Sequence, residues 1–144
     1  MASPSFSNPP DEQLREILTH SRTLAVVGLS VRPERPSHYV STSLQHAGYR
    51  IIPVNPAYPE VLGERCYGSL HQVPEKVDMV LVFRRPEFVE PVVEEAIRLK
   101  VPTVWMQVGV RHPAAARKAR EAGLQVVMDR CAWVDYQRLF GRRL

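Results

Sequence analysis

The chain has 144 residues, of which 44% are hydrophobic and 24% charged, a composition typical of one folded domain and not of a disordered or fibrous protein. Its net charge of +4 favours an anionic partner, but aromatic residues are few and zinc-finger and RNP motifs are missing, so we expect a small phosphate-bearing ligand and no nucleic acid. The apolar runs are too short to cross a bilayer and the first residues lack a secretory pattern, which predicts a cytoplasmic protein without membrane contact.

The N-terminal part of the chain predicts an arm, a helix and a strand. Residues 1–10 are rich in Ser and Pro and predict a flexible N-terminal arm, while residues 11–144 form a single domain. Asp11 is expected to cap a short amphipathic helix that covers an edge of the sheet. Residues 23–28 are a continuous apolar run of β-formers, the pattern of a strand buried on both faces.

The middle of the chain predicts two further strands. Residues 37–48 read as a helix closed by a glycine, and residues 50–54 as a second buried strand. Pro53 removes one ladder donor, so it must lie near a strand end or at a bulge. Residues 65–67 predict a short extended piece, and residues 77–83 predict the third main strand.

Helices and strands alternate to the end of the chain. Apolar residues at helical spacing predict a helix over residues 86–97, followed by a strand over 103–108. An Ala-rich helix over residues 112–122 precedes a fifth strand over 125–128, and residues 133–140 predict the last helix.

This alternation predicts an α/β fold: a Rossmann-like, three-layer arrangement with an approximately five-stranded parallel sheet and helices on both faces. In such sheets ligands bind outside the carboxyl ends of the strands, beside the point where strand order reverses. The residues that directly follow each strand are therefore the candidates for a binding site.

The loop after the first strand has the features of a phosphate site. Gly28 lets the backbone approach a ligand closely, and the helix that opens at Ser37 offers unpaired N–H groups and a positive dipole end. Arg32 and Arg35 supply guanidinium groups that bind phosphate in a bidentate fork. Alternatively, Gly28 only makes a turn and Ser37 only caps a helix. The candidate binding residues in this loop are Gly28, Leu29, Ser30, Arg32, Arg35, Ser37 and His38.

The dinucleotide fingerprint G-x-G-x-x-G fails here, because Ser30 and Pro33 stand in place of its second and third glycines. The second strand is followed by Asn55 and Pro56, where an NAD site usually places an acid. An adenine nucleotide with a phosphorylated ribose therefore fits better than NAD, and NADP stays open.

The later strand ends add further candidates. Phe83, Arg84 and Arg85 follow the third strand, where adenine stacking and phosphate pairing are both feasible. The alternative is that Phe83 belongs to the core and both arginines are solvated. Gln107 and Gly109 follow the fourth strand, as a polar amide and a glycine suited to line a narrow channel.

Cysteine and histidine spacing gives no metal or disulfide framework. Cys66 and Cys131 are far apart, and the histidines are separated singletons, so we predict no metal site. Cys131 adjoins Arg130, which favours a lowered thiol pKa, although most lone cysteines are inert. The sequence carries no nucleophile elbow, Walker loop or complete catalytic set, so we predict a ligand-binding protein with no catalytic residues.

Five segments in order resemble one known family: VVGLSVRPERPSHYV, GYRIIPVNP, DMVLVFRRP, VWMQVGV and VVMDRC. They are similar to the small stand-alone coenzyme A-binding proteins, which resemble the N-terminal domain of the succinyl-CoA synthetase α subunit. The resemblance implies coenzyme A as the ligand, with its pyrophosphate at the loop 28–38. It also implies adenosine between Asn55 and the Phe83–Arg84 turn, and pantetheine along Gln107 and Gly109.

The resemblance covers only the CoA domain of the synthetase, whose phosphorylated histidine lies on a following domain, so ligase chemistry is not carried over. We expect a module that binds CoA or acyl-CoA as a carrier, sensor or accessory subunit. Three alternatives stay open: an NADP-linked reductase, an acyl-CoA-using enzyme with Cys131 as nucleophile, and a redox module that joins CoA to a cysteine through a mixed disulfide. The apolar last helix can pack within the domain or against a second copy, and both a homo-oligomer and a partner protein stay open.

Overall fold

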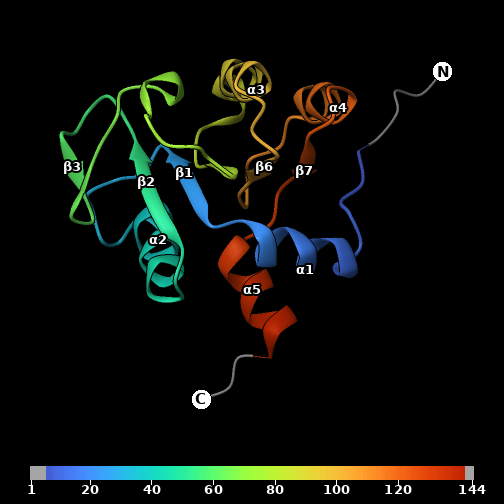
Figure 1. The fold of residues 1–144 in the computed structure, drawn as a ribbon, viewed down its shortest axis with the longest axis horizontal. Helices are drawn as coiled ribbons and strands as arrows, with labels where there is room; N and C mark the ends of the chain where they lie inside the picture. The colour runs from blue at the N-terminus through green and yellow to red at the C-terminus, as the bar shows by residue number, and fades with distance from the viewer. Residues whose placement is uncertain (1–5, 142–144) are drawn as a thin grey trace.

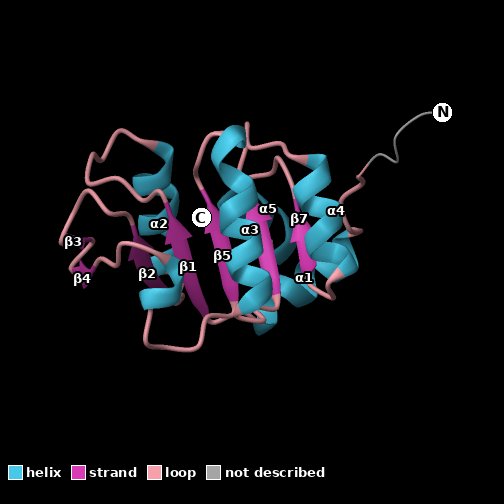
Figure 2. Ribbon diagram, turned by 90° about the horizontal axis from the view of Figure 1, so that it is seen from above, coloured by secondary structure: helices cyan, strands magenta, loops and turns pink. Residues whose placement is uncertain are grey.

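The computed structural model describes residues 6–141, which within this range form one five-stranded parallel sheet covered by helices on both faces (Figures 1 and 2). The strand order is β2-β1-β5-β6-β7, and a separate two-stranded antiparallel ribbon, β3-β4, lies after β2. The predicted α/β Rossmann-like fold is thereby confirmed. The strands are β1 (Thr23–Val27), β2 (Arg50–Val54), β3 (Glu60–Val61), β4 (Glu64–Arg65), β5 (Met79–Val82), β6 (Thr103–Met106) and β7 (Gln125–Val127). The helices are α1 (Asp11–His20), α2 (Pro36–His46), α3 (Val89–Arg98), α4 (Pro113–Glu121) and α5 (Ala132–Phe140).

The two faces of the sheet build two separate apolar clusters. Along β1, Leu24 and Val26 point to the cluster shared with α1, α2 and α5, while Ala25 and Val27 point to the cluster shared with α3 and α4. Figure 1 shows α3 and α4 on one side of the sheet and α1, α2 and α5 on the other. Because successive strand residues face opposite sides and both sides are covered, the strand is apolar at every one of these positions.

Pro53 is tolerated because β2 is an edge strand. Its ring nitrogen pairs with no neighbour, while its carbonyl accepts a hydrogen bond from the Tyr67 N–H at 3.0 Å. The predicted extended piece at 65–67 is divided in the structure: β4 ends at Arg65, and Tyr67 makes an isolated parallel bridge to Val54.

The start of α1 corrects one prediction. Asp11 does not cap the helix, because it is the first helical residue and Pro10 occupies the cap position without a side-chain bond. The Asp11 carboxylate instead binds the guanidinium of Arg138 in α5, at 2.8 and 3.0 Å. α1 packs beside α5, where Leu14 joins the buried cluster that includes Val127 of the edge strand β7.

Part of the predicted N-terminal arm is held against the domain. Asn8 exchanges two hydrogen bonds with the backbone of Met128, at 2.9 and 2.7 Å, and the Arg120 guanidinium lies 4.1 Å from the Phe6 ring centroid. Residues 6–10 therefore differ from a loose segment, since side chain and backbone groups fix them beside the end of β7. Residues 1–5 of the predicted arm lie outside the described residues.

The topology places a crevice at the carboxyl ends of the strands. The chain passes from β1 outward to β2 and then returns to β5 on the other side of β1, so strand order reverses at β1. The loops that leave β1 and β5 diverge there, which is where open α/β sheets bind ligands. In the described part of the chain, each helix is too short or too polar to cross a lipid bilayer.

Candidate functional site

Gly28 ends β1 at a position that only glycine fits. Its φ is +93°, and a Cβ added there would lie 2.5 Å from the carbonyl oxygen of Phe83 at the end of β5. The close approach that glycine permits is therefore one between two strand ends, and Gly28 also lines the pocket described below. It brings the loops after β1 and β5 against each other.

The loop after β1 is held in shape by its own hydroxyls. The Ser30 N–H donates to Ser37 Oγ at 3.0 Å, and the Arg32 N–H donates to Ser30 Oγ at 3.0 Å. Asn55, after β2, donates through Nδ2 to the Leu29 carbonyl at 3.1 Å. These bonds tie the loop to the start of α2, whose first turn begins with a proline and receives no side-chain cap. Pro36 has no N–H and the His38 N–H donates to the Arg35 carbonyl at 2.9 Å, so this turn offers an anion the Ser37 N–H and the positive end of the helix dipole.

A pocket of about 670 Å³ opens at this crevice. It crosses the carboxyl ends of β1, β5 and β6 and is closed by the first turns of α2 and α5. Its size is in the range of small-molecule and cofactor sites. The lining residues are Gly28, Ser30, Arg35, Pro36, Ser37, Tyr39, Val40, Phe83, Arg84, Arg85, Pro86, Gln107, Val108, Gly109, Val110, Cys131, Trp133 and Val134.

The charge around the pocket is positive and only partly neutralised. Arg35 and Arg84 make no ion pair within residues 6–141, and the Arg84 guanidinium lies 5.2 Å from the Phe88 ring centroid. Arg85 is 3.8 Å from the Glu87 carboxylate, an exposed pair of small energetic value. Among the described residues, no carboxylate, histidine or lysine lines the pocket. Its walls therefore offer an anion two guanidinium groups without a competing acid.

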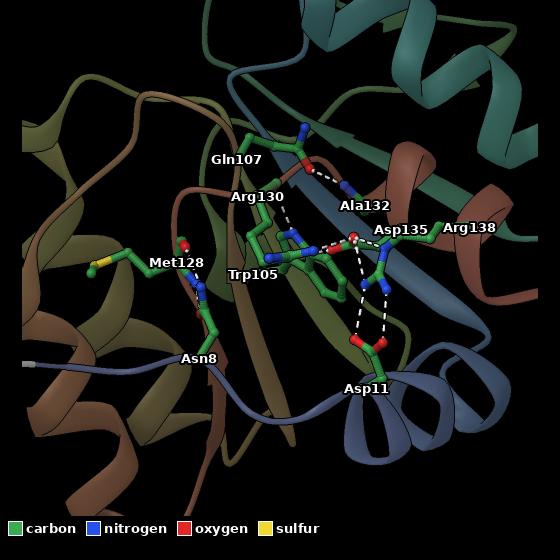
Figure 3. A network of polar contacts seen from close by, with 9 residues as sticks. All are labelled: Asn8, Asp11, Trp105, Gln107, Met128, Arg130, Ala132, Asp135 and Arg138. Carbon is green, nitrogen blue, oxygen red and sulfur yellow. Dashed lines mark hydrogen bonds and ion pairs between the residues drawn. The ribbon is translucent and has the colours of Figure 1, made fainter.

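The corner between β7 and α5 is built differently, around a buried carboxylate (Figure 3). Asp135 is 1% exposed, and its two oxygens accept hydrogen bonds from Arg130 at 2.7 Å each. Arg138 donates to the same carboxylate at 3.1 and 3.3 Å and links it to Asp11. Hydrogen bonds to these partners raise the pKa of Arg130 and lower the pKa of Asp11.

Two side chains from β6 complete this corner. Trp105 Nε1 donates to the Arg130 carbonyl at 2.9 Å, and Gln107 Oε1 accepts from the Ala132 N–H at 2.9 Å. The segment 130–132 is thus fixed by Trp105 at the Arg130 carbonyl and by Gln107 at the Ala132 N–H (Figure 3). Because Cys131 lies within this segment, the network also fixes one wall of the pocket.

The sequence of residues 22–137 matches the model of one protein family, described as the CoA binding domain. The chain belongs to the CoA binding domain family. This match spans every strand of the sheet, the whole of α2 and the first turns of α5. The predicted resemblance to stand-alone CoA-binding proteins is therefore confirmed.

Two other proteins resemble the chain over nearly its whole length. The chain is 44% identical to the uncharacterized protein YneT of Bacillus subtilis over 131 residues, which cover 91% of this chain and 97% of that protein. A solved structure of a hypothetical protein from Pyrococcus horikoshii has a TM-score of 0.91 at 39% identity and covers 98% of this chain and 99% of that one.

A larger relative contains the same domain as one part. The ADP-forming acetate–CoA ligase I of Archaeoglobus fulgidus is 31% identical over 86 residues, which are 60% of this chain and 13% of the ligase. The similarity thus spans a small fraction of that enzyme.

The CoA binding domain fold brings most predicted site residues together. Those that line the pocket are Gly28, Ser30, Arg35, Ser37, Phe83, Arg84, Arg85, Gln107 and Gly109. Phe83 is only half-buried and faces the pocket, so it is not confined to the core. These positions share one crevice because they directly follow neighbouring parallel strands.

The remaining predicted residues lie outside the pocket, each for a visible reason. Leu29 is fully buried beneath the loop, and Arg32 turns to Glu34 at 3.1 Å in an exposed pair. Asn55 uses Nδ2 on Leu29 and Oδ1 on the Ala57 N–H, so its side chain supports the loop from behind. Pro56 is exposed beyond it, and His38 is half-buried on α2.

Sequence reasoning missed the apolar residues of the pocket. Tyr39, Val108 and Val134 line it with exposed side chains, and Trp133 joins them from α5. Their signal in the sequence was weak, because Tyr39 beside Val40, and Trp133 beside Val134, follow the apolar pattern of helices that pack in a core. Cys131, considered above only for its reactivity, also lines the pocket as a free thiol.

Cys66 has a different environment. It is buried outside the pocket, and its thiol donates to the Asn55 carbonyl at 3.3 Å. Burial raises the pKa of the Cys66 thiol, which keeps it protonated and unreactive at neutral pH.

Proposed function

We propose that the chain binds coenzyme A or an acyl-CoA in this pocket and acts as a non-catalytic carrier, sensor or accessory module. The observation that carries the proposal is the pair Arg35 and Arg84, two guanidinium groups without acidic partners that flank one pocket in a CoA binding domain. The ligand's diphosphate and ribose phosphate supply the charge these groups lack.

The remaining walls fit the other parts of CoA. The Ser30 to Ser37 loop and the first turn of α2 suit a diphosphate, because they present the hydroxyls of Ser30 and Ser37, the Ser37 N–H and the positive end of the helix dipole. Phe83 suits the adenine ring, with Arg84 beside it. The far end, with Gln107, Val108 and Gly109, suits the less charged pantetheine arm.

The titratable groups of the pocket support binding over catalysis. In the described chain, those that line it are Arg35, Arg84, Arg85, Tyr39 and Cys131. Acyl transfer through a thiol needs a base within hydrogen-bond reach of the nucleophile, and none of these groups is a histidine or carboxylate.

Titration calorimetry with CoA, dephospho-CoA and NADP tests the proposal. We expect CoA to bind, and dephospho-CoA to bind about tenfold or more weakly if an arginine contacts the 3′-phosphate. Arg35→Ala and Arg84→Ala should each weaken CoA binding by a similar factor. Arg22→Ala is the matched control, since it removes one exposed charge at the opposite end of β1. Binding of NADP but not CoA would contradict the proposal.

A second candidate function is favoured by the position of Cys131 in the pocket wall. An acyl-CoA-using enzyme with this nucleophile predicts that Cys131→Ser binds CoA normally and loses turnover of an acyl-CoA. A mixed disulfide with CoA predicts instead a mass increase after incubation with CoA disulfide, abolished by the same substitution. A carrier predicts neither turnover nor adduct.

A further inference from the structure

Gln107 has an unused donor at the end of the pocket away from the phosphate loop. Its side chain is 3% exposed, and Oε1 is committed to the Ala132 N–H, which fixes the orientation of the amide. The Nε2 group donates to no acceptor within residues 6–141, and it is not sealed from the pocket that Gln107 lines. Figure 3 shows this nitrogen turned away from Ala132. A nearly buried amide with free N–H groups needs an acceptor from elsewhere.

The first turn of α5 adds donors at the same end. Cys131 is its cap residue but makes no side-chain cap bond, and Trp133 and Val134 in the first turn line the pocket. First-turn N–H groups have no acceptor within their own helix, and the helix dipole makes this end positive. Two independent elements, β6 and α5, therefore present N–H groups to one place.

Apolar side chains surround these donors. Val108 is 67% exposed and Val134 56% exposed, although both line the pocket. Exposed apolar groups that rim a pocket favour an apolar ligand group. The combination suits an oxygen acceptor joined directly to an alkyl chain.

The pantetheine arm is long enough to cross the pocket. β1 and β6, whose carboxyl end carries Gln107, are separated by two strand spacings, or about 10 Å, and β7, which precedes Cys131, lies one spacing farther, at about 14 Å. Extended pantetheine has the length of roughly four amino-acid residues, also ~14 Å. A CoA molecule with its diphosphate at the loop after β1 therefore places its sulfur near Gln107 and Cys131.

We propose that Gln107 Nε2 and the first turn of α5 bind the carbonyl oxygen of a CoA thioester, whose acyl chain packs on Val108 and Val134. The preferred ligand is then an acyl-CoA with an apolar acyl group and not free CoA, because a thiol is a weak acceptor. This inference rests on the proposed CoA function and names the form of the ligand.

Calorimetric titration with butyryl-CoA, S-butyl-CoA and free CoA tests it. S-butyl-CoA is a thioether that keeps the alkyl chain and lacks only the carbonyl oxygen. We expect butyryl-CoA to bind about tenfold more tightly than S-butyl-CoA, the effect of one well-placed hydrogen bond. Equal affinities would overturn the carbonyl site while leaving the CoA function intact. Failure of all three ligands to bind would overturn both.

Gln107→Glu tests whether the preference for butyryl-CoA comes from the Gln107 side chain. Glutamate keeps an oxygen for the Ala132 N–H and replaces the Nε2 donor, so the preference for butyryl-CoA over S-butyl-CoA should fall to near unity. Gln125→Glu is the matched control, because it adds the same charge at an exposed position of β7 and should keep the preference. A preference that survives Gln107→Glu would contradict the assignment. Thermal unfolding shows whether both variants fold. If Gln107→Glu does not fold, the comparison of butyryl-CoA with S-butyl-CoA on the unaltered protein still tests the carbonyl site.

Discussion

The two ends of the pocket differ in how their arginine side chains are paired. At the loop after β1, Arg35 is exposed and unpaired, and short hydroxyl-to-backbone bonds shape the chain. At the corner of β7 and α5, Arg130 is locked onto the buried Asp135 carboxylate, and its backbone is held by Trp105. Arg35 has no acidic partner among the described residues, whereas Arg130 is paired with Asp135 inside the fold. A guanidinium group thus indicates an anion site only where the protein has not already supplied the anion.

The largest effect should follow from breaking the contact between the ends of β1 and β5. Gly28→Ala adds a Cβ 2.5 Å from the Phe83 carbonyl oxygen at a positive φ, and we expect it to lower the free energy of unfolding by roughly 3 to 4 kcal/mol. Gly48→Ala is the control, since its φ is +112° but no atom lies within 4 Å of the added Cβ. Urea denaturation of both variants separates the clash from the backbone strain. Equal losses would show that the close approach to Phe83 carries no cost.

The next largest loss of stability should come from a substitution at the corner between β7 and α5. Asp135→Asn removes the negative charge that binds Arg130 and Arg138 and should lower the free energy of unfolding by about 2 to 3 kcal/mol, because the carboxylate is buried and fully hydrogen-bonded. Urea denaturation measures it. CoA affinity of the folded variant should fall less than for Arg35→Ala, since Asp135 does not line the pocket. The reverse order would mean that the corner, and not the phosphate loop, dominates binding.

Substitution of Asn55 tests whether this side chain supports the loop after β1 or contacts the ligand directly. Asn55→Ala removes the bonds to the Leu29 carbonyl and the Ala57 N–H, so we expect a loss of about 1 to 2 kcal/mol in the free energy of unfolding. If Asn55 acts only by holding the loop, CoA and dephospho-CoA should lose affinity by the same factor. A loss confined to one of the two ligands would show direct contact with the nucleotide.

The smallest effect belongs to Asp11. Its bonds to Arg138 lower the pKa of the Asp11 carboxyl in the folded protein, so the group stabilises the fold above its ordinary pKa of 3.8 and loses this contribution as pH falls through the folded value. Asp11→Asn should therefore be slightly less stable than the natural protein at pH 7, and the difference should shrink as pH falls below 3.8. Thermal unfolding across this range measures it. A difference that grows toward low pH would contradict the assignment.

Sequence patterns predicted the features that depend on neighbouring residues, such as the buried strands and the residues at their ends. The strand at 23–27 is apolar because both faces of the sheet are covered, and the crevice residues follow from the rule that parallel strands end at one edge. Asp11 was wrongly predicted to cap a helix, because its partner Arg138 lies 127 residues away. For the same reason, single-sequence patterns did not reveal that Asn55 supports Leu29 or that Trp133 and Val134 face the ligand pocket.

The central claim is that the free guanidinium end of the pocket holds the diphosphate of CoA. A crystal structure of the protein with CoA tests it most directly. We predict diphosphate density at the loop between Gly28 and Ser37, with Arg35 or Arg84 in contact and the pantetheine arm directed toward Gln107. Density for CoA in another place, with this loop free of phosphate, would contradict the account.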